Sequence, residues 1–595
     1  MSSERRVRIG CASAFWGDTR TAAPQLVRKG DIDYLVFDYL AEVTMSILAG
    51  AKMKDPSKGF ATDFVTILSP LLEEIKGKGI RVLSNAGGLN PLGLKEALEK
   101  EAGGRVDLKI AVVVGDDLME ALDDVRALNP VDAEKGIPLP DRVVSLNAYI
   151  GAPALVRALE TGADIVITGR CVDSALVLAP LVHEFGWKWD DFDRLAAGSI
   201  AGHILECGAQ ATGGNFTDWH LVPGYEDMGF PIAECAPDGS FTVTKPPGTG
   251  GLVSPGTVAE QLLYEVDDPA AYILPDVVCD LTEVSIEQLG ENRVRVSGVR
   301  GAPPPPAYKV SATYADGFRG EVAVVLAGLE AEEKARRVGR AVLEKVERIL
   351  KEGGLPPFTA TRVDLLGTES IYGPRRKSSP TREVVLRIAV KHGRREAVEI
   401  FSREIAQAAT GMAPGMTKIL GGLPRPSHSI CHFSFLLPKE MVSLRVLVEG
   451  EEIPVSLPSV SGEVRRRERA SVRPDGEEAA EQGETVTVPL VRLAWARSGD
   501  KGDRANVAVI SRRPEYYPFI KRALSEEAVF SYFSHLVGGP VRRYEVPGIY
   551  ALNFVMENAL GGGGMASLRV DPQGKSYGQL ILDFPVSVPR SVLEE

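Results

Sequence analysis

Short apolar runs alternate with helical patterns between residues 7 and about 170, and this alternation restricts the possible folds more than any other feature. The runs are rich in β-branched residues and indicate buried strands. Strands that are apolar along most of their length are typical of a parallel sheet covered on both faces. We therefore predict an α/β domain, with strands in residues 7–13, 32–39, 80–88, 108–117 and 163–169 and helices in residues 91–100 and 153–162.

The chain changes character after about residue 245, where proline- and glycine-rich stretches separate shorter strands. This pattern indicates an α+β portion packed on the first, so the main domain is expected to span residues 1–458, with an α/β part to about residue 245 and an α+β part over 246–458. The elements predicted in the second part are antiparallel strands at 292–298, 308–314 and 320–328, a helix at about 331–351, strands near 361–366 and 382–391, and a helix near 394–410.

A charged segment at residues 459–486 is poor in large apolar residues, and we interpret it as a linker. Its arginines Arg465–Arg467 are interpreted as solvated rather than as a nucleic-acid patch. Residues 487–595 form a smaller unit, in which mixed strands and a helix at about 514–535 favour a compact α+β domain. The other segments that carry its strand patterns are 485–499, 505–512, 549–559 and 575–586.

The charge and the cysteine spacing exclude several classes of function. The formal net charge of -12 gives no general attraction to nucleic acid or to an anionic membrane. The six cysteines form no C-x-x-C pair, which argues against a zinc ribbon or a disulfide scaffold and favours a reducing compartment. The sequence shows no apolar run long enough for a membrane span and no signal-peptide pattern at the N-terminus. We expect a cytoplasmic protein without membrane or nucleic-acid partners.

Two strand-to-helix turns carry polar residues where a parallel sheet places its ligands. Asn85, Gly87 and Gly88 follow one strand, and their main-chain N–H groups are candidates for contacting an anion. The alternative is a tight turn that needs positive φ. After another strand, Arg170 is a candidate for pairing with a carboxylate or a phosphate, while Asp173 enters the crevice or caps the next helix.

Residues 202–218 gather a carboxylate, a thiol, an amide and a hydroxyl behind an apolar helix. If this segment is helical, His203, Glu206 and Cys207 share one face. Glu206 is the preferred general acid or base, because its charge would raise the pKa of the Cys207 thiol unless His203 is cationic. The alternatives are a buried polar helix end and a metal site on His203 and Glu206. The candidate catalytic residues are Glu206, Asp173, Cys207 and His203, and Gln210, Thr212, Gly213 and Gly214 are candidate binding residues.

Further candidate binding residues lie in three glycine-rich segments. Lys245 precedes a glycine turn that contains Gly250 and resembles a phosphate cradle in composition only. The "ARSGDKGD" segment is expected to be a loop between two strands, and it pairs in our interpretation with a later run of four glycines. A solvated hairpin is the alternative, and a domain or subunit interface is a possible setting. The candidates in these last two segments are Arg497, Ser498, Asp500, Lys501, Asp503 and Arg569.

Six segments together resemble the acyclic terpene utilisation AtuA family. They are "NAGGLNP", "ITGRCVDSALVLAP", "GHILECGAQATGGNFTDW", "KPPGTGGLVSPGTVAEQLLYE", "ARSGDKGDRANVAVI" and "ALGGGGMASLRVDPQGKSYGQ". The likeness covers nearly the whole chain and implies a main AtuA domain followed by a ferredoxin-like domain. It implies catabolism of acyclic terpenes or branched acyl-CoA chains, with acyl-CoA carboxylases and enoyl-CoA hydratases as companions, and it provides no catalytic residue to carry over.

Our first hypothesis is an enzyme that acts on a branched or terpenoid acyl-CoA or carboxylate, by hydration, dehydration or C–C cleavage next to a carbonyl. No covalently bound cofactor is expected, and acyl-CoA is a possible substrate. The donors for an enolate-like oxygen would come from the glycine turns at Gly87–Gly88 and Thr212–Gly214. A non-catalytic assembly subunit for carboxylase or hydratase partners is the second hypothesis, and a metal-dependent hydrolase is the third. We expect a homo-oligomer.

Overall fold

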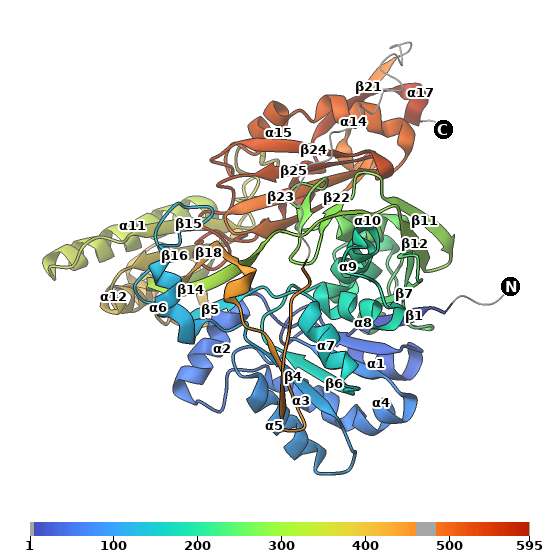
Figure 1. Cartoon of the computed structure of the whole chain (residues 1–595). Coiled ribbons are helices and arrows are strands. Elements are labelled where there is room, and N and C mark those ends of the chain that lie inside the picture. The colour runs from blue at the N-terminus through green and yellow to red at the C-terminus, as the bar shows by residue number, and fades with distance from the viewer. Residues whose placement is uncertain (1–4, 460–483, 594–595) are drawn as a thin grey trace.

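The apolar runs of the N-terminal part form five adjacent parallel strands at the centre of one large sheet (Figure 1). The computed structural model describes residues 5–459 and 484–593. The parallel strands are β1 (Val7–Cys11), β2 (Tyr34–Phe37), β3 (Arg81–Ser84), β6 (Ile165–Thr168) and β4 (Ile110–Val114), in that spatial order. All five were predicted. Their side chains are almost entirely buried, as the continuous apolar runs require.

Antiparallel strands extend this sheet at both edges, which makes it a mixed sheet of eleven strands. An edge strand presents unpaired N–H and C=O groups, and pairing with a hairpin satisfies them. The segments on the two sides of residue 245 thus share one sheet, together with a hairpin from near residue 450. The added strands are β7 (Ile232–Cys235), β8 (Phe241–Thr244), β12 (Arg293–Ser297) and β11 (Ser285–Gly290) beyond β1, and β19 (Arg445–Val448) and β20 (Glu451–Pro454) beyond β4.

Helices cover both faces of the parallel strands. Leu35 and Phe37 of β2 belong to one apolar core, while Val36 between them belongs to the other, because successive strand residues point to opposite faces. One face is covered by α1 (Ala22–Lys29), α2 (Glu42–Lys54), α3 (Thr62–Leu68), α4 (Leu72–Lys78) and α5 (Pro91–Ala102). The other face is covered by α7 (Pro153–Glu160), α8 (Ala175–Phe185), α9 (Phe192–Glu206) and α10 (Pro255–Leu262).

A second sheet of six strands projects from this body and is built around one long strand, β14 (Ala307–Ala327). The sequence predicts two strands here. The two predicted strands are one continuous strand in the structure. The pairing of β14 with β18 shifts register between Ala315 and Phe318, and β16 becomes a partner from Phe318 onward. Its neighbours are β16 (Glu383–His392), β15 (Ala360–Leu366), β17 (Met416–Leu420), β18 (Ser427–Pro438) and β5 (Ser145–Ala148). The helices packed on it are α11 (Ala331–Glu352) and α12 (Arg395–Ala406), close to their predicted positions.

The C-terminal domain is an antiparallel sheet with the order β22-β23-β25-β24, covered by helices. The strands are β22 (Ala494–Lys501), β23 (Arg504–Ser511), β24 (Val541–Val546) and β25 (Ala551–Met556). The helix predicted at 514–535 is two helices, because Leu524 leaves the helical conformation and Ser525 caps the second one. These helices are α14 (Tyr517–Ala523) and α15 (Glu526–Tyr532), and the remaining elements are α16 (Tyr577–Ile581) and the pair β21 (Thr485–Pro489) with β26 (Pro585–Pro589).

The C-terminal domain and the main domain share one apolar core. Ala508 and Ile510 of β23 and Ala551 of β25 belong to the same buried cluster as α9 and α10. The predicted linker lies mostly outside the described residues, since 460–483 are not described and β21 begins at Thr485. Within residues 5–459 and 484–593, no helix has the length and apolar character needed to cross a membrane.

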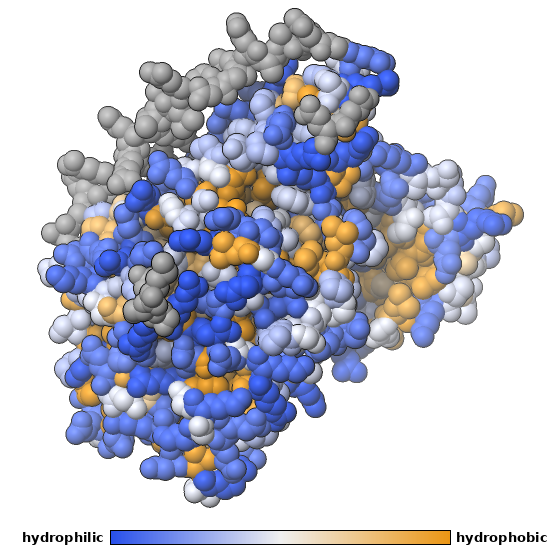
Figure 2. All heavy atoms as spheres, turned by 90° about the vertical axis from the view of Figure 1, so that its right-hand side faces the viewer, coloured by the Kyte–Doolittle hydropathy of each residue, from blue (hydrophilic) through white to orange (hydrophobic). Residues whose placement is uncertain are grey.

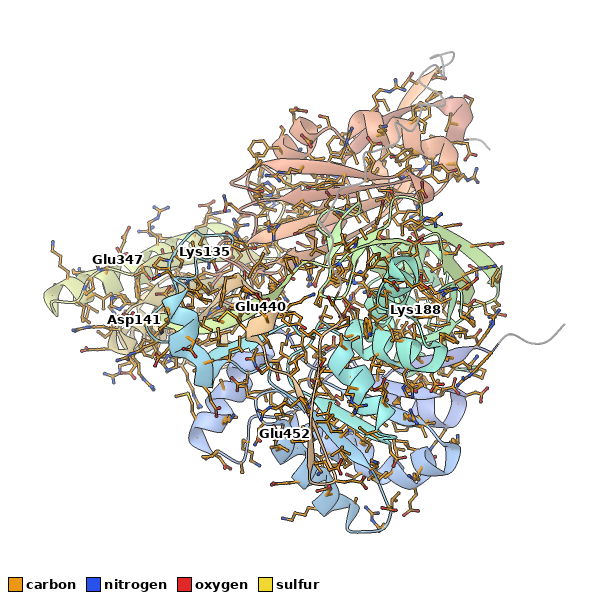
Figure 3. All side chains as sticks on the ribbon, viewed as in Figure 1. Lys135, Asp141, Lys188, Glu347, Glu440 and Glu452 are labelled. Carbon is orange, nitrogen blue, oxygen red and sulfur yellow. The ribbon has the colours of Figure 1, made fainter. Side chains whose placement is uncertain are left out.

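The surface shows no single dominant apolar face in the view of Figure 2. Hydrophilic residues prevail there, and hydrophobic residues occur in small groups between them. In Figure 3, Glu347 on α11 lies on the projecting part and Lys188 lies near α8 of the main body, so the two labels mark opposite sides of the molecule. An α/β sheet places its functional groups at the C-terminal ends of its parallel strands.

Candidate functional site

Asp38 lies at the C-terminal end of β2, and its carboxyl is oriented by the neighbouring strand end. Asn85, which follows β3, donates from Nδ2 to Asp38 Oδ1 over 2.6 Å and accepts from the Tyr39 main chain over 2.8 Å. Ser13 donates to the Asp38 carbonyl oxygen over 2.9 Å. Asn85 therefore holds a carboxyl in place through protein contacts. Sequence reasoning missed Asp38, although a carboxylate directly after a buried strand was a usable signal.

Arg170 follows β6 and is buried among carboxylates. Its Nη1 donates to Asp173 Oδ1 over 2.5 Å and to the Cys171 carbonyl over 2.7 Å. Its guanidinium lies 4.0 Å from the centre of the Tyr149 ring, a cation–π contact. Its main-chain N–H donates over 2.7 Å to Asp116, whose pKa burial raises to about 7. The predicted pairing of Arg170 with a carboxylate is thus made within the protein, and Asp173 forms no side-chain cap on α8.

Three carboxyl groups, those of Asp38, Asp173 and Glu206, act on each other around this arginine. Burial raises the pKa of Asp38 well above its usual range, the Asp173 carboxylate raises it further, and Arg170 opposes the rise. Glu206 adds to the rise from the end of α9. Like charges that cannot all ionise keep a proton among themselves. Burial and like-charge repulsion therefore favour the protonated form of Asp38, and a proton-donating acid close to other carboxyl groups is suited to acid–base catalysis.

Glu206 is within hydrogen-bond distance of His203, which lies one turn earlier on α9. His203 Nε2 lies 3.1 Å from the Leu262 carbonyl oxygen, which can only accept, so Nε2 carries a hydrogen. His203 Nδ1 lies 3.1 Å from Glu206 Oε1 and 3.5 Å from the Tyr272 hydroxyl. Burial raises the pKa of Glu206, while His203 lowers it. Glu206 keeps 15% of its side chain exposed and is accessible to a ligand, whereas His203 is buried at 1%.

Cys207, the third residue of this predicted face, has a thiol that ionises poorly. Burial raises the pKa of its thiol well above the usual value, and the adjacent Glu206 raises it further. A thiol must ionise to act as a nucleophile. The like-charge effect expected from the sequence therefore operates here, and we remove Cys207 from the reacting groups.

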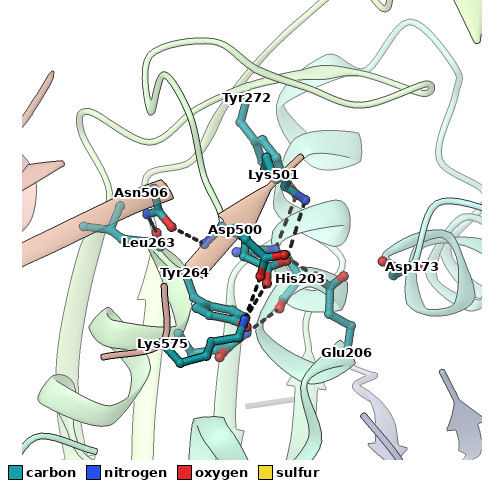
Figure 4. A network of polar contacts seen from close by, with 12 residues as sticks. Asp173, His203, Glu206, Leu263, Tyr264, Tyr272, Asp500, Lys501, Asn506 and Lys575 are labelled. Atoms are coloured by element: carbon teal, nitrogen blue, oxygen red, sulfur yellow. Dashed lines mark hydrogen bonds and ion pairs between the residues drawn. The ribbon is translucent and has the colours of Figure 1, made fainter. Parts of the chain in front are cut away.

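The hairpin between β22 and β23 brings a second set of charges to the same region (Figure 4). In Figure 4 the Lys501 amine and the Glu206 carboxyl point toward one region beside His203, with Asp173 beyond Glu206. Lys501 is one of the charges that lower the pKa of Glu206.

The residues from Arg497 to Asn506 do not form the loop that the sequence predicts. They lie on two paired strands with a turn at Gly502–Asp503, and only the turn is irregular.

Several predicted binding residues instead join the two domains or stabilise the C-terminal domain. Arg497 donates to Gln210 Oε1 and packs over the Tyr264 ring at 4.6 Å. Ser498 Oγ donates to the Gly574 carbonyl over 2.6 Å and accepts from the Gly578 main chain over 2.8 Å. These polar groups have protein partners, so the structure gives them a role in packing.

The run of four glycines packs against its own chain. Asp503 accepts from the main-chain N–H groups of Leu560 and Gly562 over 3.0 and 2.9 Å. A Cβ at Gly563 would lie 2.9 Å from the Gly502 carbonyl oxygen. Arg569 donates to the Leu536 carbonyl over 2.8 Å. The close approach inferred from these glycines is thus made by the hairpin turn of the same chain.

In the two glycine turns proposed as oxyanion donors, Gly88, Gly213 and Gly214 donate their N–H groups to nearby main-chain carbonyls. Gly88 has φ of 52° and donates to the Asn85 carbonyl over 3.1 Å. Gly213 and Gly214 donate to the carbonyls of Gln210 and Ala209. A Cβ at Gly87 would lie 2.5 Å from the Thr168 carbonyl oxygen. The tight-turn alternative accounts for these positions, and Thr212 likewise donates its hydroxyl to main-chain carbonyls.

Lys245 and Gly250 lie apart from the carboxyl centre. Lys245 Nζ donates to the Thr249 carbonyl over 2.7 Å, and the charges acting on it are those of Glu291 and Asp227. A Cβ at Gly250 would lie 2.0 Å from the Gly224 carbonyl oxygen, so this glycine permits a close main-chain contact. Asn85, Arg170 and Glu206 all act on Asp38, whereas the charges that act on Lys245 are those of Glu291 and Asp227.

The metal-site alternatives find no support in the geometry. Both ring nitrogens of His203 have protein partners. His428 and His432, which occur four residues apart in the sequence, lie on β18, where His432 contacts Ser311 and the His428 ring packs at a tilt against Phe318. Across residues 5–459 and 484–593 no group of three potential ligands is arranged to hold a metal ion.

The domain contact near this centre contains a buried titratable carboxyl, that of Glu260 on α10. Its Oε1 accepts from the Thr217 main chain over 3.1 Å, and Thr217 in turn bonds to the Ala496 main chain of β22. Burial raises the pKa of Glu260 from 4.5 to about 7, against lowering contributions from Thr217 and Arg497. Because the folded pKa exceeds the unfolded one, the contribution of Glu260 to stability is complete below about pH 4.5 and is lost as pH rises through 7.

We expect Glu260→Gln to stabilise the protein at pH 8 and to change stability little at pH 4.5. The charge that the folded state tolerates poorly is absent from the variant, and the amide oxygen still accepts from Thr217. A rise of 2.5 pKa units, from 4.5 to 7, corresponds to about 3 kcal/mol, an upper estimate for the gain at pH 8. Urea unfolding at both pH values measures it. A difference between variant and parent that does not change with pH would contradict the prediction.

Two family models match the chain, one over most of its length and one near its C-terminal end. The family model described as Acyclic terpene utilisation family protein AtuA matches residues 7–448. The model described as AtuA ferredoxin-like domain matches residues 488–587. The chain matches none of the curated proteins and none of the solved structures with which it was compared.

Proposed function

Because this chain belongs to the acyclic terpene utilisation AtuA family, we propose that it catalyses acid–base chemistry next to the carbonyl of a branched acyclic substrate. Family membership indicates a role in acyclic terpene utilisation. Within that role the proposed reaction is reversible hydration of an α,β-unsaturated acyl compound. The proposed substrate is a branched acyl-CoA or carboxylate, and its activation requires no covalently bound cofactor. The proposed partner is an acyl-CoA carboxylase or hydratase, which would supply this substrate or consume the product.

The observation that carries this proposal is the placement of Glu206. Its carboxyl is partly accessible, has a raised pKa and lies at hydrogen-bond distance from a histidine whose other nitrogen is fixed by a main-chain carbonyl. Beside it, burial and the Asp173 carboxylate raise the pKa of Asp38, against the opposing charge of Arg170. One base and one acid within one region are what removal of water from a β-hydroxy acyl compound requires.

In the dehydration direction, the Glu206 carboxylate takes the proton on the carbon next to the carbonyl. The C–H electron pair forms the new C=C bond as the bond to the β-hydroxyl breaks. The Asp38–Asp173 pair donates a proton to the departing hydroxyl, which leaves as water. Hydration reverses each step, and no oxidant or reductant takes part.

We expect Glu206→Gln to lower turnover of 3-methyl-branched 2-enoyl thioesters about 10²- to 10⁴-fold, the usual contribution of a general acid–base group. Glutamine matches the shape of glutamate but cannot take the proton. Hydration is followed by loss of the ultraviolet absorbance of the conjugated thioester, with CoA and carboxylate forms of the substrate compared. Circular dichroism establishes that the variant is folded.

The matched control is Glu101→Gln on the exposed side of α5, which should keep the parent rate. Equal turnover by Glu206→Gln and the parent would remove Glu206 from the mechanism. A parent protein that turns over none of these substrates, yet purifies in a stable complex with an acyl-CoA carboxylase or hydratase, would favour the non-catalytic assembly role instead.

A further inference from the structure

Strand β22 of the C-terminal domain passes close to the main chain that follows α10 in the main domain. A Cβ at Gly499 would lie 2.5 Å from Glu265 Cγ and 2.7 Å from Tyr264 Cε2. These distances are shorter than any ordinary van der Waals contact, so only glycine allows β22 to pass here. Two residues further along β22 is Lys501, whose side chain extends toward Glu206 and Tyr272.

Two buried asparagines of the C-terminal sheet hold the main chain that follows α10. Asn506 accepts from the Glu265 N–H over 3.0 Å and donates to the Leu263 carbonyl over 2.8 Å. Asn553 donates to the Val266 carbonyl over 2.8 Å and to the Asp267 carbonyl over 2.7 Å. The two side chains also bond to each other over 3.0 Å. This set of bonds, which we call the asparagine clamp, fixes β23 and therefore its hairpin partner β22 against residues 263–267.

The clamp holds Glu265 in a position where its carboxylate meets two cations. Glu265 has φ of 59°, a conformation that a residue with a side chain adopts only when its surroundings impose it. Its carboxylate lies 3.1 Å from Lys575 Nζ and 3.8 Å from Lys501 Nζ. Lys575 also lies 3.0 Å from Asp500. Burial raises the pKa of Glu265, but the two lysines outweigh it and lower that pKa, so the carboxylate stays charged and orients them.

The other cations of the centre are held by different groups. Arg170 is enclosed by Asp173, the Cys171 carbonyl and the Tyr149 ring. Lys575 donates to Tyr264 as well as to its two carboxylates. Lys501 is the cation whose charge acts on both Glu206 and Tyr272, and 39% of its side chain is exposed. In Figure 4 its amine lies on the same side of His203 as the carboxyl of Glu206, the proposed general base.

We infer that Lys501 is a catalytic residue that stabilises the negative charge on the substrate carbonyl oxygen while Glu206 removes the neighbouring proton, and that Asn506 positions it. This inference rests on the proposed function. The centre is then shared between the two domains, with the base on α9 and the cation on the β22–β23 hairpin. An ammonium fixed before the reaction stabilises developing charge without having to reorganise. The substrate class is a compound whose carbonyl oxygen becomes enolate-like, which includes thioesters and carboxylates.

The test uses Lys501→Met and Lys501→Ala in the full chain, with branched 2-enoyl thioesters as the probe. We expect kcat to fall about 10²- to 10³-fold while KM changes less than about threefold, because the lost interaction is made mainly in the transition state. Added alkylammonium salts should restore part of the activity of Lys501→Ala, which a purely structural defect would not allow. The matched control is Lys521→Met on α14, whose partner Glu545 belongs to the same domain.

Asn506 is tested through a double-mutant cycle. Asn506→Ala should lower kcat with little change in KM, and adding Lys501→Met to it should cause little further loss, because both changes remove the same interaction. Losses that multiply would overturn the positioning role of Asn506. If Lys501→Met keeps the parent kcat while Glu206→Gln is inactive, the role of Lys501 is wrong and the acid–base function stands. If Glu206→Gln keeps the parent rate, the proposed function itself fails.

Discussion

Arg170→Met is expected to lower the free energy of unfolding by about 3–5 kcal/mol near neutral pH, the usual cost of removing one partner from a buried ion pair. Arg170 is 3% exposed, and its guanidinium contacts Asp173 and the Tyr149 ring. Methionine keeps much of the side-chain volume but leaves Asp38 and Asp173 without the cation that offsets their repulsion.

The loss should depend on pH in a defined direction. Arg170 lowers the pKa of Asp38, so its removal raises the folded-state pKa further while the unfolded-state value is unchanged. A carboxyl with a raised folded pKa loses its contribution to stability as pH rises. The deficit of Arg170→Met relative to the parent should therefore be larger at pH 8 than at pH 5.

Urea unfolding at these two pH values measures the deficit, and Arg157→Met is the matched control. Arg157 lies on α7 and forms an exposed pair with Glu160, a class of interaction worth at most about 1 kcal/mol. An Arg170→Met deficit no larger than that of the control would show that the carboxyl centre does not depend on this cation.

Arg387→Met is the second large effect that we expect, again about 3–5 kcal/mol of unfolding free energy. Arg387 lies on β16 in the second sheet, where it donates to Asp364 over 2.8 Å and to both oxygens of Glu321 over 2.8 and 2.7 Å. It also donates to the Leu568 carbonyl over 2.7 Å, which joins this sheet to the C-terminal domain. The change leaves Asp364, whose side chain is 4% exposed, with a poorly compensated charge.

The double variant Arg387→Met with Asp364→Asn separates charge from packing. Removing the uncompensated charge of Asp364 should recover part of the lost free energy of unfolding, so the double variant should be more stable than Arg387→Met alone. Chemical denaturation of both variants measures this, with Arg395→Met on α12 as an exposed control. A double variant less stable than the single one would mean that the loss comes from packing and from the Leu568 contact.

The strands of the α/β core could be read from the sequence because their burial is local information. A parallel strand is buried on both faces, so residues such as Leu35, Val36 and Phe37 are all apolar, and the pattern needs no knowledge of the partner strand. The same holds for the face shared by His203 and Glu206, which follows from helical spacing alone. The merging of two predicted strands into β14 could not be read in this way, because it depends on which strands pair across the register shift.

The sequence by itself determined the parallel core of the large sheet, the helices α5 and α7 on its faces, and Asp173 and Glu206 as candidates for the carboxyl centre, since each follows from neighbours within a few turns of chain. Only the tertiary structure decided that Asp38 joins Asp173 and Glu206, that the Lys245 turn stays apart, and that Lys501 reaches Glu206 across a domain contact. The physical reason is that the interaction between two charged side chains depends on their distance in space and not on their separation along the sequence. Residues 206 and 501 are brought together by a shared apolar core and by two asparagines that bond to main-chain atoms, and main-chain atoms carry no sequence signal.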